Sequence, residues 1–295
     1  MSKLKQHQPA LSIEEQIGNL ISIGLEIEDV DYAADILNDI SYFRLVKAFG
    51  LGLKPKNKIF DGVKFKQIVN LYYFNSDLRQ LLFPAIETIE VILRCRIANF
   101  FSSEYGCFGY KDSSNFQSPD YHFAFVNDIN SEIKRNGRTP FVKNFMTNYE
   151  GGEIPFYALI ELFSFGLLSK FFKNLRSDDK KEIAKSFGIS YKYFESWVES
   201  ISYVRNICAH YGRLYNMKLT KSPKLYPQHK GISNYRIFGI ILSLKYMLYK
   251  NKAWSTVHGG LIVLMSMYKE VDASKMGFPE NWKIILAETP ERLSQ

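Results

Sequence analysis

The chain is poor in the residues that build metal centres and disulfide frameworks. Its 295 residues include only three cysteines, Cys95, Cys107 and Cys208, an odd number without CxxC spacing. No HExxH, P-loop or GxGxxG pattern occurs either, so the common signatures of zinc proteases, P-loop NTPases and dinucleotide-binding domains are missing. We therefore expect neither a metal nor a cofactor. The few cysteines are typical of proteins from a reducing compartment.

Long hydrophobic runs are also missing. The N-terminal segment MSKLKQHQPALSIEEQ has no apolar stretch of the kind found in a signal peptide. The segment FGIILSLKYMLY is apolar, but it is too short and too basic to span a bilayer. These absences predict a cytoplasmic protein that does not contact a membrane. Alternating strand patterns, internal repeats and low-complexity segments are absent as well.

Acidic residues are missing from one long stretch of the chain. Residues 200–269 contain eleven Lys or Arg and no Asp or Glu, and the remainder sums to −3 because the whole chain carries +8. A segment of one sign and this length is a candidate surface for a polyanion such as RNA. The alternative is a solvated basic surface without a partner.

Helical patterns dominate what is present. Hydrophobic residues make up 46% of the chain, which is ordinary for a folded globular protein, and they recur at helical spacing. The sequence predicts an all-α protein with an N-terminal helical region, residues 1–60, followed by a main helical domain, residues 61–295. The segment 51–62 contains Lys, Gly and Pro and is the predicted boundary.

Several helices have recognisable local signals. Ser12 and Glu15 have the spacing of a capping box in front of an apolar helical pattern. A much longer helical pattern follows the boundary segment, and Pro84 inside it predicts a kink or two helices. Further along the same pattern Glu90 and Arg94 are four residues apart, which predicts a helical ion pair with a structural role.

Residues 191–211 have the pattern of one helix that ends in the polar sequence RNICAH. Asn206 and His210 are four residues apart and share one face, and Arg205 can extend its long side chain toward the same region. Gly212 predicts the end of the helix. Three polar side chains can therefore converge at one helix end.

An arginine together with a histidine suits phosphodiester chemistry. A histidine can move the proton of a hydroxyl group or protonate a leaving oxygen, because its pKa lies near neutrality. A guanidinium can hold a phosphate through two hydrogen bonds and stabilise the charge of the transition state. On RNA the adjacent 2′-OH is an internal nucleophile, so the step requires no metal. Taken alone, the spacing favours a surface arginine and a capping histidine over a catalytic pair, because so short a motif also occurs by chance.

The motif and its flanks resemble a known family. RNICAH has the RN-x3-H pattern of the HEPN superfamily of helical ribonucleases. The flanking blocks resemble the abortive-infection (Abi-like) family, antiphage proteins of the AbiD and AbiF type. They extend from Leu11 to Trp282 in the order of that family: LSIEEQI, ISYFRLVKAF, IEVILRCRIANFFSSEYGCFGY, IELFSFGLLSKFFKNL, RNICAHYGRLYN and MGFPENW.

This resemblance implies a fold, an activity and partners. The fold would be an HEPN-type helical bundle that usually dimerises, so that two motifs face each other in a homodimer. The activity would be metal-independent cleavage of RNA that leaves a 2′,3′-cyclic phosphate and a 5′-OH. By motif position, Arg205 and His210 are implied to be catalytic and Asn206 to orient them. The implied role is an endoribonuclease toxin of abortive-infection phage defence, controlled by a structured noncoding antitoxin RNA.

Candidate RNA contacts follow the motif. Tyr215 could stack on a base and Arg213 could hold a phosphate, although packing of the loop after the motif explains both residues equally well. Tyrosines interleave with the lysines of this region, which suits single-stranded or looped RNA. The predicted RNA-binding residues are Arg213, Tyr215, Lys218, Lys221, Lys224 and Lys230.

Two other functions remain open from the sequence. The first is a catalytically inactive module that uses the same fold to hold a structured RNA. The second is a toxin neutralised by a nucleotidyltransferase-like protein. Arg205 and His210 favour an enzyme, whereas the basic segment fits an enzyme and an RNA-binding module equally.

Overall fold

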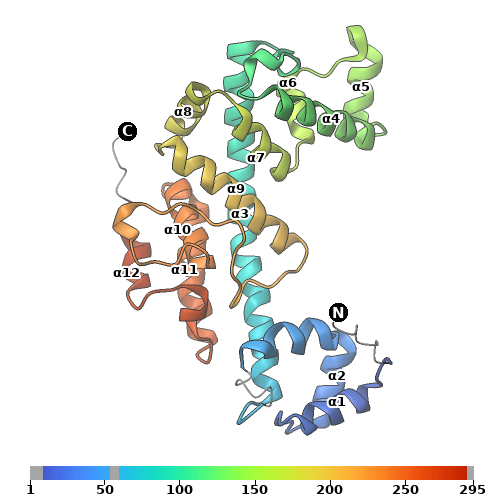
Figure 1. The fold of residues 1–295 in the computed structure, drawn as a ribbon, viewed down its shortest axis with the longest axis vertical. Coiled ribbons are helices and arrows are strands. Elements are labelled where there is room, and N and C mark those ends of the chain that lie inside the picture. Colours follow the sequence, from blue (N-terminus) through green and yellow to red (C-terminus); the bar gives the residue numbers. More distant parts are fainter. Residues whose placement is uncertain (1–8, 54–59, 291–295) are drawn as a thin grey trace, which may run out of the picture. The chain divides into compact units, whose positions relative to one another are not determined.

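The structure, a computed structural model, describes residues 9–53 and 60–290 of the chain. Over these residues the chain folds into helices joined by loops and forms no β-strand (Figure 1). Isolated β-bridges join Glu26 to Lys64 and Phe116 to Leu175. The predicted all-α class is confirmed.

The chain divides into two compact units. The first comprises residues 1–78 and 264–271, and the second comprises residues 79–263 and 272–295. This division falls inside a helix, whereas the sequence analysis placed the boundary at residue 60. Part of the predicted boundary segment, residues 54–59, lies outside the described residues.

Contacts between distant segments explain why the first unit extends beyond residue 60. The Tyr268 hydroxyl donates a hydrogen bond to Asp77 Oδ2 at 2.7 Å. The ring of the same tyrosine packs edge-on against Phe74, with 5.5 Å between centroids. These contacts are made between residues far apart in the sequence, so local composition does not reveal them.

The first unit begins with two short helices, α1 (Ile13–Ser22) and α2 (Val30–Asp39), which pack on each other. Ser12 Oγ accepts the N–H of Glu15 at 3.2 Å, and Glu15 Oε2 accepts the N–H of Ser12 at 2.7 Å. The predicted capping box is thereby confirmed, and it satisfies N–H groups that have no partner within the helix.

The helix α3 (Phe65–Tyr105) is continuous over 41 residues, with Pro84 inside it. One helix therefore replaces the predicted alternative of two. Pro84 is exposed, whereas its neighbours Leu82, Ala85 and Ile86 are at most 2% exposed. Burial on both sides of the proline outweighs the one backbone hydrogen bond that it cannot donate.

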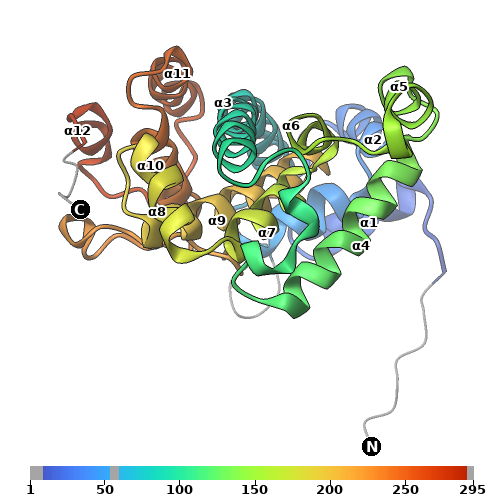
Figure 2. The same cartoon turned by 90° about the horizontal axis from the view of Figure 1, so that it is seen from above.

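The second unit contains the remaining helices, shown from two directions in Figures 1 and 2. They are the later part of α3, α4 (Pro119–Asn136), α5 (Pro140–Asn148), α6 (Phe156–Leu159), α7 (Phe165–Asn174), α8 (Ser177–Ser186), α9 (Tyr191–Ala209), α10 (Ile237–Leu248), α11 (Lys252–Met267, whose last turn belongs to the first unit) and α12 (Trp282–Ala287). Of these, α7 and α9 make the most extensive helix–helix contact.

Aromatic rings fill the core beneath α7 and α9. Phe156 and Phe171 stack at 4.9 Å between centroids, and Phe101 lies 5.1 Å from Phe171. Phe172 of α7 meets Phe194 of α9 edge-on at 5.2 Å. Such closely packed rings resist deformation, so they hold α9 in a defined position relative to α7.

Candidate functional site

The helix α9 carries the RNICAH sequence at its C-terminal end. Its apolar face is buried as the spacing predicts, at Phe194, Val198, Ile201, Val204 and Cys208. Burial raises the pKa of the Cys208 thiol to about 12, so this cysteine stays protonated and unreactive near neutral pH. The polar residues of the motif lie outside this buried face.

Asn206 and His210 are both exposed and lie about one helical turn apart. The N–H of His210 donates to the carbonyl oxygen of Asn206 at 3.1 Å. Within the described part of the chain, no hydrogen bond or ion pair engages either side chain. Both are therefore free to meet a ligand, as the sequence analysis requires of them.

Arg205 points toward α3 instead. Its Nε lies 3.5 Å from Glu90 Oε2, and its guanidinium carbon lies 5.7 Å from the centroid of the Phe83 ring. The Arg205 side chain is 31% exposed and that of Glu90 is 10% exposed. Nε is buried, so the carboxylate and the ring hold the inner part of the guanidinium while the rest of the side chain reaches solvent.

Glu90 connects two arginines. Arg94 Nη2 donates to Glu90 Oε1 at 2.9 Å, which confirms the ion pair predicted from the spacing. The same nitrogen donates to the carbonyl oxygen of Phe163 at 2.9 Å. Glu161 Oε2 also lies 4.0 Å from Arg94 Nε, so Glu90 and Glu161 together balance the two guanidinium groups. The outer part of the Arg205 guanidinium, which reaches solvent, is the part that could meet an anionic ligand.

The contact between Glu90 and Arg205 was missed by the sequence analysis. The Glu90–Arg94 spacing was visible and was interpreted as a structural pair within one helix. Arg205 lies in another helix, more than a hundred residues further on, and no local pattern links the two.

A second missed residue, Arg79, holds the chain just after the motif. It is 8% exposed, and its Nη1 donates to the carbonyl oxygen of Gly212 at 3.1 Å. Its guanidinium carbon also lies 6.0 Å from the centroid of the Tyr211 ring. A cation at this place satisfies carbonyl groups beyond the C-terminus of α9 and suits the negative end of the helix dipole.

The end of α9 differs in detail from the prediction. The helix ends at Ala209, and Tyr211 rather than Gly212 adopts a left-handed conformation, with φ of 57°. Tyr211 N–H donates to Cys208 O at 3.1 Å and Gly212 N–H donates to Ile207 O at 2.7 Å. These are the two hydrogen bonds of a Schellman motif, in which glycine is the usual left-handed residue. Backbone strain is therefore stored next to His210.

The predicted RNA-binding residues are dispersed along the loop between α9 and α10. Tyr215 is 5% exposed, and burial raises the pKa of its hydroxyl to about 12. The prediction that Tyr215 stacks on a base therefore needs correction, because a buried ring offers no open face. Burial, together with the nearby Arg236, lowers the pKa of Arg213, so this arginine is part of the loop packing as well as a candidate phosphate contact.

The four lysines of the loop are exposed. Lys221 Nζ donates to Glu199 Oε1 at 3.1 Å. The carbonyl oxygen of Lys224 accepts the indole N–H of Trp197 at 2.6 Å. The loop thus returns along α9 toward its N-terminus. Lys218 Nζ lies 5.7 Å from the centroid of the Tyr235 ring. Lys230 lines a cavity whose lining does not include Lys221.

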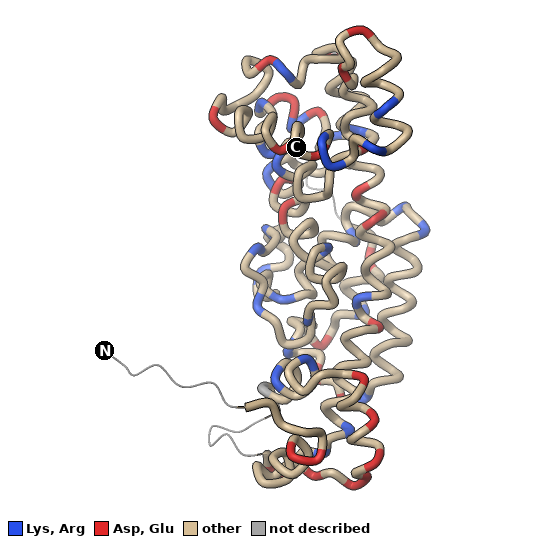
Figure 3. The backbone as a smooth tube through the Cα atoms, turned by 90° about the vertical axis from the view of Figure 1, so that its right-hand side faces the viewer, with Lys and Arg blue, Asp and Glu red and all other residues tan. Residues whose placement is uncertain are grey.

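Acidic residues from other segments lie beside the basic segment in space. Glu90 meets Arg205, and Glu199 meets Lys221. Figure 3 shows the acidic and basic residues along the backbone. Lys245 is 2% exposed and donates to the carbonyl oxygen of Ile285. The eleven basic residues are therefore not a single exposed surface.

A cavity of about 500 Å³ lies among α4, α7 and α9, and Asn206 is part of its lining. Tyr203 and Glu199, one and two turns earlier on α9, line it too. Its volume falls in the range of small-molecule sites. The cavity connects the motif to the loop, because Lys221 also belongs to its lining.

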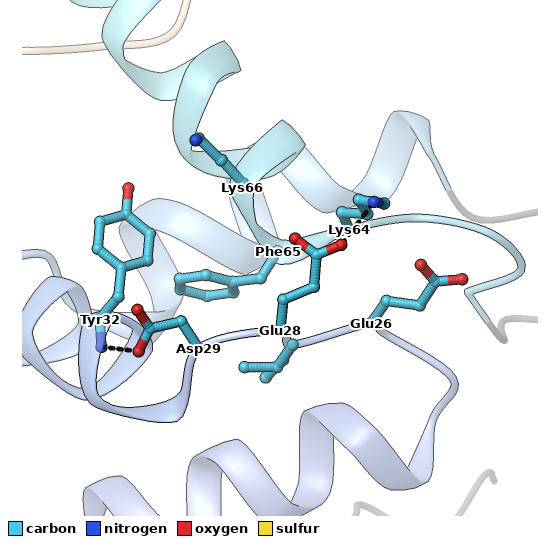
Figure 4. Close-up of a pocket in the computed structure, with 8 residues that line it drawn as sticks. Glu26, Glu28, Asp29, Tyr32, Lys64, Phe65 and Lys66 are labelled. Carbon is cyan, nitrogen blue, oxygen red and sulfur yellow. Dashed lines mark hydrogen bonds and ion pairs between the residues drawn. The ribbon is translucent and has the colours of Figure 1, made fainter.

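The first unit has a smaller cavity of about 350 Å³ (Figure 4). Its acidic residues have local structural roles: Glu28 pairs with Lys64, and Asp29 accepts the N–H of Tyr32 at 2.9 Å at the start of α2. Over the described ranges, no three His, Cys, Asp or Glu side chains form a group that could hold a metal ion. Nor is any helix in those ranges long and apolar enough to cross a bilayer.

The fold and the site define an all-α protein with an exposed Asn–His pair and a carboxylate-anchored arginine at one helix end. A family model described as Abi-like protein matches residues 35–216, more than half of the chain and including the whole motif. The chain therefore belongs to the Abi-like family. No curated protein and no solved structure matches it.

Proposed function

We propose that this protein is an HEPN-type endoribonuclease that acts in the cytoplasm as the toxin of an abortive-infection defence against phage. The observation that carries the proposal is the end of α9. Exposed His210 and Asn206 lie there beside Arg205, whose inner guanidinium is held by Glu90. Membership of the Abi-like family supports the defensive role.

The proposed reaction is an internal transfer at phosphorus. The ribose 2′-oxygen forms a bond to phosphorus while the bond from phosphorus to the 5′-oxygen breaks, giving a 2′,3′-cyclic phosphate and a 5′-OH. The 2′-OH gives up its proton to a base, and the leaving 5′-oxygen takes a proton from an acid. His210 is the proposed proton carrier. Arg205 stabilises the phosphoryl oxygens, and Asn206 orients the ribose or the phosphate.

His210 is the residue on which the test rests. RNA-free wild-type protein should cleave cellular RNA in the presence of EDTA, and His210→Ala should lose ~10²–10⁴-fold in rate. Analysis of the RNA ends should find cyclic phosphates and free 5′-hydroxyls. Full activity in the variant, or no cleavage by the wild type, would contradict the proposal. Inactive wild type that still binds RNA would identify an RNA-binding module instead.

The reaction moves two protons, whereas one chain supplies one motif histidine. We therefore propose a homodimer in which two motifs share one cleft. We also propose that a structured noncoding RNA controls this toxin as its antitoxin. If the site is shared, a mixture of Arg205→Ala and His210→Ala chains should cleave RNA faster than either variant alone. A fully active protein that light scattering finds to be monomeric would contradict the shared site.

A further inference from the structure

The cavity beside Asn206 has a volume and a set of lining groups that suit one nucleotide. It has a volume of about 500 Å³ and is lined by three helices and the loop after α9. Asn206 is the only motif residue in its lining, and the side chain has no partner among the described residues. A group bound in this cavity would therefore contact the motif through Asn206. The inference below rests on the proposed function for that placement.

The charges in the cavity alternate instead of sharing one sign. Lys170 Nζ donates to Asp128 Oδ2 at 3.0 Å, and Lys221 donates to Glu199. A surface that follows the phosphate backbone gains most from unbroken positive charge. Carboxylates next to lysines instead offer acceptors and donors side by side, which is what the edge of a nucleobase requires.

Tyrosines contribute flat surfaces to the same cavity. Tyr203 is half-buried on α9, and Tyr121 of α4 is 68% exposed. Aromatic faces in a cavity with hydrogen-bonding groups are typical of sites that hold an unpaired base. The lining thus favours a single-stranded nucleotide over a duplex.

Glu199 contributes a carboxylate to the lining of the cavity. Lys221 and Lys173 both approach its Oε1, at 3.1 and 3.8 Å. No hydrogen bond within the described chain engages Oε2, and the side chain is 36% exposed. Oε2 therefore stays open, and Oε1, which accepts one hydrogen bond from Lys221, has a second lone pair, so the carboxylate can accept two more donors while a lysine ammonium stays beside it.

We infer that this cavity binds guanine. The Watson–Crick edge of guanine presents two adjacent N–H donors, which match the Glu199 carboxylate, and the O6 acceptor beside them matches Lys221. Adenine and cytosine place an unprotonated ring nitrogen next to their amino group, which would face the carboxylate. Uracil has one N–H between two carbonyl groups, both of which Glu199 would repel.

Binding of free nucleotides tests this without requiring cleavage. Titration of the RNA-free full chain with nucleoside 3′-monophosphates should give guanosine 3′-monophosphate a Kd about tenfold lower than the other three. Glu199→Gln should reduce the preference to about twofold or less, because the amide puts a donor where an acceptor is needed. Glu195→Gln is the matched control, one turn earlier on α9, where Glu195 pairs with Lys180 and lies outside the cavity.

Inosine 3′-monophosphate tests the same contact from the ligand side. It lacks the 2-amino group of guanine, so it should bind the wild type more weakly than guanosine 3′-monophosphate does. In Glu199→Gln the two should bind alike. This comparison stays informative in the wild-type chain even if a cavity variant fails to fold.

The outcomes separate this inference from the proposed function. A guanine preference that depends on Glu199 in a protein that cuts no RNA would support the cavity and contradict the ribonuclease. Active cleavage with equal or absent binding of the four nucleotides would overturn the guanine site alone. Equal losses in Glu195→Gln and Glu199→Gln would also overturn it, because the effect would then not belong to the cavity.

Discussion

The buried side chain of Glu90 combines a role in the stability of the fold with a role in the candidate site. With its side chain 10% exposed, it contacts Arg94 of its own helix and Arg205 of the motif. A buried carboxylate needs such partners, because an unpaired charge away from water is costly. The two guanidinium groups in turn are oriented by the carboxylate. Glu90 is therefore a positioning residue for Arg205.

Replacement of Glu90 should affect stability and activity together. Glu90→Gln removes the carboxylate that Arg205 contacts and leaves Arg94 with only the more distant Glu161, so we expect a loss of about 2–3 kcal/mol in the free energy of unfolding. Loss of the Arg205 orientation should reduce the rate of RNA cleavage by ~10²-fold at temperatures where the variant is folded. Urea denaturation and single-turnover cleavage measure the two effects.

Two further variants separate positioning from folding. Glu87→Gln changes an exposed carboxylate of the same helix and should alter stability by no more than about 0.5 kcal/mol. Glu90→Asp keeps the charge and should recover part of the lost activity. If Glu90→Gln cleaved at the wild-type rate, its contact with Arg205 would have only a structural role.

At the scale of the secondary-structure element, the end of α9 decides where His210 lies. The Schellman hydrogen bonds, the left-handed Tyr211 and the bonds from Arg79 all fall within three residues of the motif. Tyrosine is an unfavourable choice for a left-handed position, and surrounding contacts must compensate for it. The turn is thus held by tertiary contacts rather than by the preference of its residues.

Gly212→Ala should disrupt this turn. A Cβ atom at Gly212 would lie 2.7 Å from Ile207 Cγ2 and 3.0 Å from the carbonyl oxygen of Ile207. The backbone oxygen cannot easily move, because it accepts the Gly212 N–H. We expect a loss of about 1–3 kcal/mol in the free energy of unfolding, measured by denaturant titration.

Gly259→Ala is the matched control and should have the opposite sign. Gly259 lies within α11, and a Cβ atom there meets nothing within 4 Å. Alanine in a helix is favoured over glycine by roughly 0.5–1 kcal/mol. A destabilised Gly259→Ala, or an unaffected Gly212→Ala, would show that the space around these glycines does not control stability.

On the scale of the whole molecule, we predict that charge determines which surface meets RNA. Lys218, Lys221 and Lys224 remain exposed after folding. Reversal of these three charges should weaken RNA binding and reduce the steepness of its salt dependence, because fewer counterions are released. Filter binding of RNA over a range of salt concentrations measures both quantities.

The control for this surface is another exposed triplet in the second unit. Lys134, Lys143 and Lys185 lie on α4, α5 and α8, and their reversal changes the net charge by the same amount. Lys54, Lys56 and Lys58 of the predicted boundary segment would be an alternative comparison, but they lie outside the described residues. Equal losses from the two described triplets would indicate diffuse attraction without a defined RNA surface.

Much of the local structure followed from the sequence by itself. The all-α class, the capping box at Ser12, the buried face of α9 and the Glu90–Arg94 pair depend on residues within a few positions of one another. Helix caps, apolar spacing and i,i+4 pairs act over that range. The motif residues were also found in this way, since all three belong to one helical turn and its cap.

Only the tertiary structure decided the surroundings of the motif. It brought Glu90 and Arg79 of α3 to the end of α9, buried Tyr215, and paired Lys221 with Glu199. Each of these results depends on which helices lie side by side, which is set by packing of the whole core. The sequence therefore determined which groups the motif contains, and the fold determined which charges and cavities they meet.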